Sequence, residues 1–326
     1  MLKSRNNKSL TNGYIVINIK KTVKLLLMKE KNKAWLIDSS IYVFKSWYTY
    51  PECEDMDGHS INAVMGFTDF VFRLLSNEKP ELIAFAFDES LTTSHRRDIY
   101  PEYKANRSPA PESLRYQFRL CRAFIESLGI YQSASNSYEA DDLIGTWAKY
   151  LNQSSIPVNI ITADKDLAQL VCEGDHWWEY ARGEMLDVKK ITKRFKAKPS
   201  QIADQLAIAG DKADNIPGVP GLGMSTAGKL LRKFENIDQL FLRVDEIQTM
   251  QIRGAKRIQD LIVEHEDSIR LSKRLTKICC DIEPVTFEQF GFGDVDIKTF
   301  GGIAEQLQFS DERFEKWLQL LKTLRG

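Results

Sequence analysis

Nine acidic residues stand where their carboxylates could meet in one site. Some directly follow apolar runs that we expect to be strands: Asp38, Asp88, Asp164 and Asp166. Others open an expected helix or flank a Gly/Pro-rich turn: Glu139, Asp141 and Asp142, then Asp211 and Asp214. Ligands of open parallel sheets bind beyond the carboxyl ends of the strands, so we expect these side chains to converge on one sheet edge.

Each carboxylate taken singly has an ordinary structural explanation. An Asp after a strand is commonly a turn former or a helix cap, and the helix dipole favours acids in a first turn. The explanation fails for the group, because two like charges about 4 Å apart repel by roughly 4 kcal/mol at an effective dielectric near 20. Oxygen ligands suit Mg²⁺ or Mn²⁺. The pattern therefore predicts paired ions that promote phosphoryl hydrolysis.

Basic and aromatic residues are interleaved between Asp88 and Leu114. The segment contains Arg96, Arg97, Tyr100, Tyr103, Lys104 and Arg107. This combination suits single-stranded nucleic acid, which binds through charge and through stacking of bases on aromatic rings. A solvated basic loop is the alternative. The segment far exceeds the roughly 2–6 residues of an ordinary strand–helix connection, which favours a functional role.

A Gly/Pro-rich turn at residues 210–223 lies between two expected helices. Its backbone amides and the N-terminus of the second helix form an arrangement that binds phosphate. Such a contact needs no base-reading side chain and should be independent of DNA sequence. An ordinary helix–helix turn is the alternative. The residues expected to contact DNA here are Gly218, Gly221, Gly223, Ser225, Thr226 and Lys229.

The elements that would position these residues change character along the chain. Apolar runs at 34–37, 82–87 and 157–162 predict strands. Between and after them, amphipathic stretches predict helices at 61–75, 114–128 and 139–151. This alternation predicts a parallel sheet with covering helices. Beyond about residue 189 only helices are expected, at 199–209, 225–234, 255–265 and 266–275.

Composition limits the class of protein. The chain has 326 residues, 43% of them hydrophobic, and 45 basic residues balance 45 acidic ones. Zero net charge argues weakly against a nucleic-acid partner, although an acidic metal site can cancel a basic DNA surface. The five cysteines form no C-x-x-C pair, so we expect neither a disulfide framework nor a zinc site, and a cytoplasmic location. No apolar run approaches the roughly 18 residues that cross a membrane.

Residues 1–33 are rich in Lys and Asn, and lysines interrupt their two apolar patches. A secretory signal is a poor fit, because no small-residue cleavage site follows. Two interpretations remain open. The segment is a disordered basic arm, or Met28 is the true start of the protein.

Six stretches, in this order, resemble the bacterial and phage 5′-nuclease family, which includes the N-terminal domain of DNA polymerase I and phage flap endonucleases. They are Leu36–Ser40, Phe87–Asp88, Pro101–Arg107, Tyr138–Asp142, Thr162–Asp166 and Gly210–Gly223. The matches run from about Ala34 to Phe234, most of the chain. Six ordered matches are highly specific.

The resemblance implies a PIN-like α/β catalytic domain over residues 34–188, with a helical arch at 89–113. It also implies a helical region over 189–326 with a helix-hairpin-helix element around 199–234. Two divalent ions and hydrolysis that leaves a 5′-phosphate are implied as well. The hairpin at 218–223 resembles one that often holds K⁺ through backbone carbonyls.

The family pattern also implies a role for each acid. By position, the first metal cluster consists of Asp38, Asp88, Glu139, Asp141 and Asp142. The second consists of Asp164, Asp166, Asp211 and Asp214. Lys104 and Arg107 match arch residues that engage the scissile phosphate.

The sequence departs from the family pattern in several places. Ser39 stands where the polymerase domain usually has Gly, and Lys45 replaces an Arg. Met224–Thr226 lacks the Lys that commonly precedes the Thr, which removes one phosphate contact; Lys229 and Lys233 are placed to compensate in part. No polymerase domain follows, so we expect a free-standing nuclease.

We therefore expect a metal-dependent 5′–3′ exonuclease and 5′-flap endonuclease, acting as a monomer on DNA with a free or single-stranded 5′ end. Two alternatives remain. A structure-specific DNA-binding protein with weak catalysis is disfavoured by the presence of all nine acids. A PIN-type ribonuclease is disfavoured by the arch and the Gly/Pro hairpin, which serve larger duplex junctions.

Overall fold

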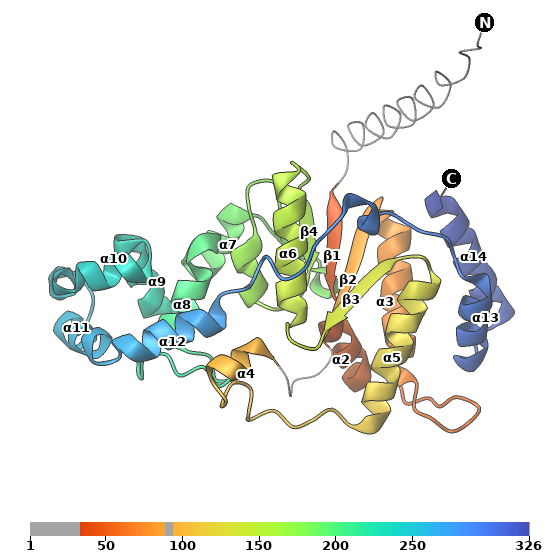
Figure 1. Cartoon of the computed structure of the whole chain (residues 1–326), viewed down its shortest axis with the longest axis horizontal. Coiled ribbons are helices and arrows are strands. Elements are labelled where there is room, and N and C mark those ends of the chain that lie inside the picture. The colour runs from red at the N-terminus through yellow and green to blue at the C-terminus, as the bar shows by residue number, and fades with distance from the viewer. Residues whose placement is uncertain (1–32, 89–93, 326) are drawn as a thin grey trace, which may run out of the picture.

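The computed structural model describes residues 33–88 and 94–325. A six-stranded sheet forms its centre, in the order β3-β2-β1-β4-β5-β6 (Figure 1). The strands are β1 Ala34–Asp38, β2 Leu82–Asp88, β3 Tyr131–Ser135, β4 Val158–Ile161, β5 His176–Glu179 and β6 Glu184–Leu186. Every neighbouring pair is parallel except β5 and β6. The expected parallel sheet is confirmed, with an antiparallel strand added at one edge.

Helices cover both faces of the sheet. Alternate residues of a strand point to opposite faces, so Ile37 and Phe85 enter one buried cluster while Leu36 and Ala84 enter the other. The first face is covered by α2 Ser39–Thr49, α3 Asn62–Glu78, α5 Glu112–Ser127, α13 Ile297–Gln306 and α14 Asp311–Arg325. The second is covered by α6 Ala140–Gln153 and α7 Val188–Phe195.

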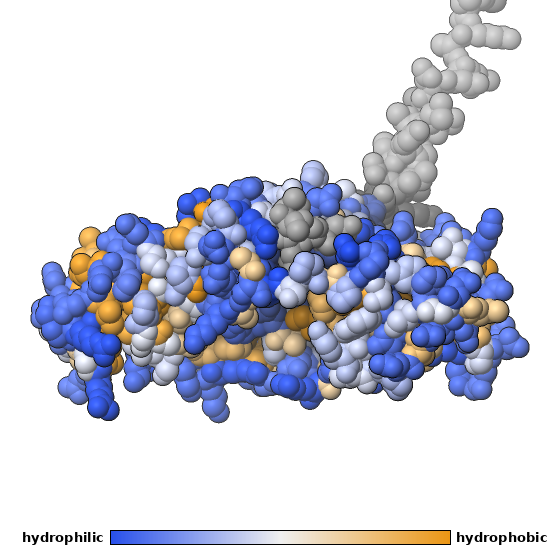
Figure 2. Space-filling view, turned by 90° about the horizontal axis from the view of Figure 1, so that it is seen from below, coloured by the Kyte–Doolittle hydropathy of each residue, from blue (hydrophilic) through white to orange (hydrophobic). Residues whose placement is uncertain are grey.

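A helical end with its own core extends from the sheet (Figure 1). It consists of α8 Ile202–Ala209, α9 Met224–Phe234, α10 Ile237–Leu242, α11 Ala255–Glu264 and α12 Glu266–Thr276. Phe234, Leu240 and Ile262 are fully buried there. The expected helices are confirmed with shifts of up to three residues at their ends; the expected start at 199 is a 3-10 turn, Pro199–Gln201, that leads into α8. Figure 2 shows hydrophobic residues exposed at this end, which carries Leu242 and Val263.

The last part of the chain returns to the sheet. Ile278 and Phe290 pack in the cluster beneath α6. Phe300 and Trp317, from α13 and α14, pack in the cluster formed by α3 and α5. Residues 189–326 therefore do not form one separate unit, because their apolar side chains complete the core of the α/β half.

Several elements were absent from the expectations, three strands and α2 among them. The strand β3 has the polar sequence Tyr-Gln-Ser-Ala-Ser and lies at an edge, so it shows no apolar run. The strands β5 and β6 are short, and α2 follows β1 without an intervening loop. Pairing and packing with neighbouring elements determine the structure of these segments more than the hydrophobic pattern of their own sequences does.

Several expectations fall on residues outside the described ranges. These are residues 1–32 of the N-terminal extension and residues 89–93 of the arch segment. Neither interpretation of the extension is therefore tested. Within the described ranges, no helix combines the length and the apolar character needed to span a bilayer.

Candidate metal centre

The ends of β1 and β2 bring two predicted acids to the same edge of the sheet, beside the start of α6. Asp38 is 4% exposed, and the Thr162 hydroxyl donates to its Oδ2 at 2.8 Å. Asp88 Oδ1 accepts from the Ala140 amide at 2.9 Å. The first bond joins the end of β1 to the residue that follows β4, and the second fixes the end of β2 against the first turn of α6, so the strand ends meet as the parallel sheet predicts.

Three acids at this edge hold more negative charge than their surroundings neutralise. Burial, together with the charges of Asp88 and Asp164, raises the pKa of Asp38 to about 8. Burial also raises the pKa of Asp141, and Asp164 and Asp38 add to the effect. The carboxyl of Asp166 has its pKa raised to about 7 by burial and by Asp164. The edge of the sheet therefore favours a bound cation or protons.

The hairpin loop brings a further acid toward the loop that follows β4. Lys165 Nζ lies 2.6 Å from Asp211 Oδ2 and 3.4 Å from Asp166 Oδ1. That Oδ1 atom is buried and makes no hydrogen bond within the described residues. An all-carboxylate donor set with an unbonded, buried oxygen fits a hard divalent cation.

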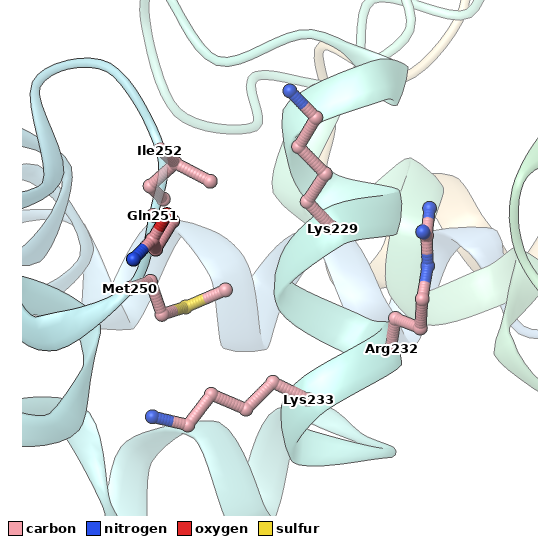
Figure 3. A pocket seen from close by; sticks show the side chains of 6 residues that line it. All are labelled: Lys229, Arg232, Lys233, Met250, Gln251 and Ile252. Carbon is pink, nitrogen blue, oxygen red and sulfur yellow. The ribbon is translucent and has the colours of Figure 1, made fainter.

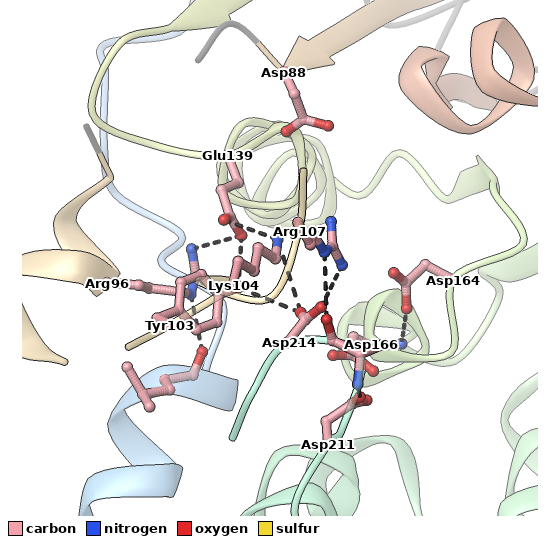
Figure 4. A network of polar contacts seen from close by, with 12 residues as sticks. Asp88, Arg96, Tyr103, Lys104, Arg107, Glu139, Asp164, Asp166, Asp211 and Asp214 are labelled. Carbon is pink, nitrogen blue, oxygen red and sulfur yellow. Dashed lines mark hydrogen bonds and ion pairs between the residues drawn. The ribbon is translucent and has the colours of Figure 1, made fainter. Parts of the chain in front are cut away.

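Cations from the arch segment lie over this site (Figure 4). Lys104 Nζ lies 2.9 Å from Glu139 Oε1 and 3.8 Å from Asp214 Oδ2, and Arg107 pairs with Asp214. Burial alone would raise the pKa of Glu139, but Lys104 and Arg96 lower it below its ordinary value. The arch segment thus neutralises Glu139 and Asp214, whereas Lys165, in the loop after β4, pairs with Asp211.

The described part of the arch segment is docked on the hairpin loop. The Lys104 amide donates to Asp214 O at 2.9 Å, and Asn106 Nδ2 donates to Lys212 O at 2.9 Å. In return, Asn215 Nδ2 donates to a carbonyl of the arch at 2.7 Å. The only helix between 94 and 111 is the short α4 His95–Ile99, so the expected helical arch is mostly a turn here.

Two family models match the chain in succession. One is the 5′-3′ exonuclease N-terminal resolvase-like domain, at residues 33–196, and the other is the 5′-3′ exonuclease C-terminal SAM fold, at residues 197–298. The chain belongs to the 5′–3′ exonuclease family. The first model extends eight residues beyond the predicted domain boundary at 188, through α7.

Individual relatives agree with this assignment. A 5′-3′ exonuclease of Buchnera aphidicola subsp. Schizaphis graminum is 30% identical, over 86% of this chain and 99% of its own length. DNA polymerase I of Rhizobium leguminosarum is 32% identical over 78% of this chain; the match spans 25% of that polymerase. The chain therefore spans about a quarter of the length of this relative.

Solved structures share the fold at lower identity. The 5′-exonuclease of bacteriophage T5, solved with bound zinc, has a TM-score of 0.60 and 18% identity, covering 84% of this chain and 99% of its own. The catalytic core of Rad2 in complex with a DNA substrate has a TM-score of 0.59 and 16% identity, covering 90% and 92%. Both likenesses concern the fold.

In this member of the family, Arg96 has a different position from the one its sequence context predicts. The residue is 2% exposed, and its guanidinium binds both oxygens of Asp142, at 2.6 and 2.8 Å. It also donates to Leu275 O at 2.9 Å and lies 3.3 Å from Glu139 Oε2. The predicted contact of Arg96 with DNA does not fit this burial. Instead, Arg96 anchors the described start of the arch segment to α6, through Asp142, and to α12, through the carbonyl of Leu275.

Asp142, which the sequence predicts as a metal ligand, has both carboxylate oxygens bound by groups of the protein. Both of its oxygens bind Arg96, and they also accept from the amides of Cys279, at 2.8 Å, and Glu139, at 3.1 Å. The residue is fully buried. Its place is a closed ion pair with Arg96, which also lies beside Glu139 on the same helix face.

Other predicted DNA contacts divide into buried and exposed groups. Tyr103 is 3% exposed and donates to Glu139 Oε2 at 3.1 Å, so its ring is not free to stack on bases. Arg97 is half-buried and bonds to Lys104 O at 3.4 Å. Gly218 is buried, and its amide donates to Ser272 Oγ. The exposed or half-exposed members are Gly221, Gly223, Ser225, Thr226 and Lys229.

One grouping of possible metal ligands was not predicted. Asp55, Asp57 and His59 lie in the loop between α2 and α3, and a ligand atom from each falls within 4.8 Å of the others. No three of the nine predicted acids, all in described parts of the chain, gather that tightly. The D-x-D-x-H spacing could have flagged the loop, although exposed acidic turns are common without an ion.

Proposed function

We propose that this member of the 5′–3′ exonuclease family hydrolyses DNA phosphodiesters near free 5′ ends, as an exonuclease and as a 5′-flap endonuclease. The reaction uses two Mg²⁺ or Mn²⁺ ions and leaves 5′-phosphates. The observation that carries the proposal is the excess of carboxylates at the sheet edge, with Lys104 and Arg107 directly above it. Metal-assisted phosphoryl hydrolysis needs both features.

The divalent ions would be held by the acids that lack a basic partner. Asp38, Asp88, Asp141 and Asp164 have no ion pair with any described residue, and Asp166 has an oxygen without a hydrogen bond. Bound ions would supply the nucleophilic water at neutral pH and stabilise charge on the phosphate. Asp211 and Asp214, now paired with Lys165 and Arg107, would complete the second position.

The arch cations act on the scissile phosphate. Lys104 and Arg107 now neutralise Glu139 and Asp214. Bound divalent ions would neutralise those carboxylates in turn, which would leave the two side chains free to bind a phosphate lying on the same edge. There they stabilise the negative charge that develops in the transition state.

The hairpin holds the duplex. Gly221 has φ +82, which L side chains rarely adopt, so the turn itself requires glycine there. Gly223 has an ordinary φ, and a Cβ added to it would meet no atom within 4 Å. The fold does not require glycine at 223, so we infer that close approach of a DNA phosphate does. A K⁺ ion at the hairpin carbonyls belongs to the same proposal.

The test compares end-blocked flap substrates under single-turnover conditions. A bulky group on the single-stranded 5′ end, attached before enzyme is added, should suppress cutting, because a strand that enters between the arch segment and the acidic edge must pass its end through. The same group on the 3′ end should have little effect. Excess chelator should abolish cutting of both. Equal rates on the two blocked DNAs would contradict the requirement for a free 5′ end.

Two further substrates separate the remaining possibilities. A flap of ribonucleotides that is cut faster than the DNA flap would favour the ribonuclease alternative. Binding of flap DNA without metal-dependent cutting would favour a structure-specific binding protein. A monomeric, cytoplasmic enzyme is part of the proposal, and the five cysteines, all free, suit a reducing compartment.

A further inference from the structure

One buried hydroxyl joins the two groups of acids at the sheet edge. Thr162 directly follows β4 and is fully buried. Its Oγ1 donates to Asp38 Oδ2 at 2.8 Å and accepts from the amide of Asp164 at 2.9 Å. The family pattern places Asp38 in the first metal cluster and Asp164 in the second. A single side chain at the end of a strand is therefore hydrogen-bonded to a member of each cluster.

The sheet fixes the position of this hydroxyl. The Thr162 amide donates to Trp178 O at 3.1 Å, which extends the pairing of β4 with β5 by one residue. Threonine is branched at Cβ, so its χ1 angle is restricted. The indole of the buried Trp177 donates to Asp164 O at 2.7 Å. The backbone of Asp164 is thus held at its amide by Thr162 and at its carbonyl by β5.

A purely local role does not account for both bonds of the hydroxyl. A Thr hydroxyl that accepts from the amide two residues further on is a common way to close a turn. The bond that Thr162 donates is different, since Asp38 lies 124 residues away in the sequence. That bond restricts the rotation of a buried carboxylate that forms no ion pair with any described residue.

Paired ions give this connection a consequence for the metal centre. Two ions that act on one phosphate lie about 3.5–4 Å apart, so the ligands of the two positions must keep a fixed relative placement. Groups that hydrogen-bond to metal ligands orient them, and their loss typically costs about 10- to 100-fold in metal affinity or activity. A hydroxyl bonded to Asp38 and Asp164 acts on both positions at once.

We propose that Thr162 is a positioning residue for both divalent ions. Its hydroxyl orients the Asp38 carboxylate and holds the Asp164 backbone beside it. The inference rests on the proposed function for the pair of ions alone. Thr162 itself touches neither an ion nor DNA, because its hydroxyl hydrogen is directed at Asp38 and it accepts from Asp164.

The test measures binding of Mn²⁺ by isothermal titration calorimetry, without DNA. Thr162→Val keeps the shape of the side chain and removes the hydroxyl, so it should bind Mn²⁺ about 10- to 100-fold more weakly than the wild type. Thr162→Ser keeps the hydroxyl and should stay close to the wild type. Thr162→Ala should bind more weakly than Thr162→Ser by a similar factor. This second pair also differs by one hydroxyl, and it decides the question if Thr162→Val does not fold.

The matched control is Thr68→Val. Thr68, on α3, is also fully buried, and its Oγ1 donates to Met65 O at 2.8 Å and accepts from Arg313 at 2.9 Å. This variant should lower the melting temperature and keep the wild-type affinity for Mn²⁺. Equal affinities within both Thr162 pairs would overturn the proposal. So would an equal loss in Thr68→Val, since that would show an effect of general loosening of the fold.

DNA binding in chelator gives an independent outcome. The exposed cations of the helical end, such as Lys229 and Arg232 on α9, lie around a separate groove whose lining does not include Thr162 (Figure 3). The Thr162 variants should therefore bind flap DNA as the wild type does when metal is absent. A loss of DNA affinity as large as the loss of Mn²⁺ affinity would overturn the proposal.

Cleavage separates this inference from the proposed function. In single-turnover cutting of flap DNA, Thr162→Val should need about 10- to 100-fold more Mg²⁺ for its half-maximal rate. Wild-type cutting with an Mn²⁺ affinity that does not depend on the hydroxyl would overturn this inference alone. Mn²⁺ binding that depends on the hydroxyl, in a protein that leaves flap DNA uncut, would contradict the proposed function alone.

Discussion

Charged residues are treated in opposite ways at the two ends of this molecule. At the sheet edge, Arg96 and Lys104 are buried against Glu139 and Asp142 in short ion pairs. At the helical end, cations such as Arg232 are exposed and have no described partner. The first arrangement holds charges at fixed positions, and the second leaves them free to attract a polyanion.

This difference between buried and exposed charges indicates which property of the protein each region controls. Interactions between charges are strong in a buried site but carry a desolvation cost. Exposed charges interact weakly with one another, and salt screens them. Substitutions at the sheet edge should therefore change the chemical step and the stability. Those at the helical end should change affinity and salt dependence.

The largest effect is expected from Asp164→Asn/Asp166→Asn. Loss of two carboxylates from the unpaired cluster removes the charge that holds divalent ions, so the single-turnover rate should fall by several orders of magnitude. DNA binding should remain or tighten, because negative charge is removed. Asp281→Asn, at an exposed ion pair with Lys149, is the control. Near-normal cutting by the double variant would show that these acids are not the metal ligands.

Lys104→Ala should slow the chemical step by about 100-fold, as loss of one transition-state donor does elsewhere. Affinity for flap DNA should change much less, because the side chain is largely buried and pairs with Glu139. Single-turnover rates at saturating DNA, with binding measured separately, give the two effects. An unchanged rate with weaker binding would make Lys104 a docking contact for DNA.

Arg96→Gln should destabilise the protein by about 3–5 kcal/mol, because it leaves Asp142 buried without its partner. Urea unfolding measures the loss. Arg232→Ala, which removes an exposed and unpaired guanidinium, should change stability by less than about 0.5 kcal/mol. Similar values for the two variants would erase the contrast between buried and exposed cations. Arg96→Gln with Asp142→Asn should cost less than the single change.

The smallest expected effect is on thermal stability as a function of pH. The pKa values of Asp38, about 8, and Asp166, about 7, lie above the ordinary value of 3.8. Protons therefore bind more tightly to the folded state, so this contribution to stability is present near pH 4 and is lost as pH rises toward 8. In chelator the melting temperature should fall by a few degrees between about pH 5 and pH 8. Saturating Mg²⁺ should remove most of that fall, since an ion that binds the folded state stabilises it.

The control for this prediction is Asp38→Asn/Asp166→Asn, which should lose the pH dependence in chelator. A melting temperature that stays constant with pH in the metal-free wild type would mean that the two carboxyls ionise normally. The sheet edge would then resemble the solvated helical end.

Much of the site could be predicted because it depends on local pattern. An apolar run followed by Asp is visible at Asp38, Asp88 and Asp164, and the topology of parallel sheets brings strand ends together. The prediction failed where a charge has a partner distant in sequence. Arg96 and Asp142 are 46 residues apart, and the carbonyl of Leu275 that also binds Arg96 is 179 residues away.

The sequence alone determined which residue types lie at the ends of strands and helices, since hydrophobic periodicity and turn chemistry act over a few residues. It therefore determined the α/β class, the strand-end acids and the Gly/Pro turn. Only the tertiary structure decided which charges are buried together, because burial depends on contacts between elements that are far apart in the sequence. The return of α12 beside α4 turned a predicted DNA contact, Arg96, into the internal anchor of the arch.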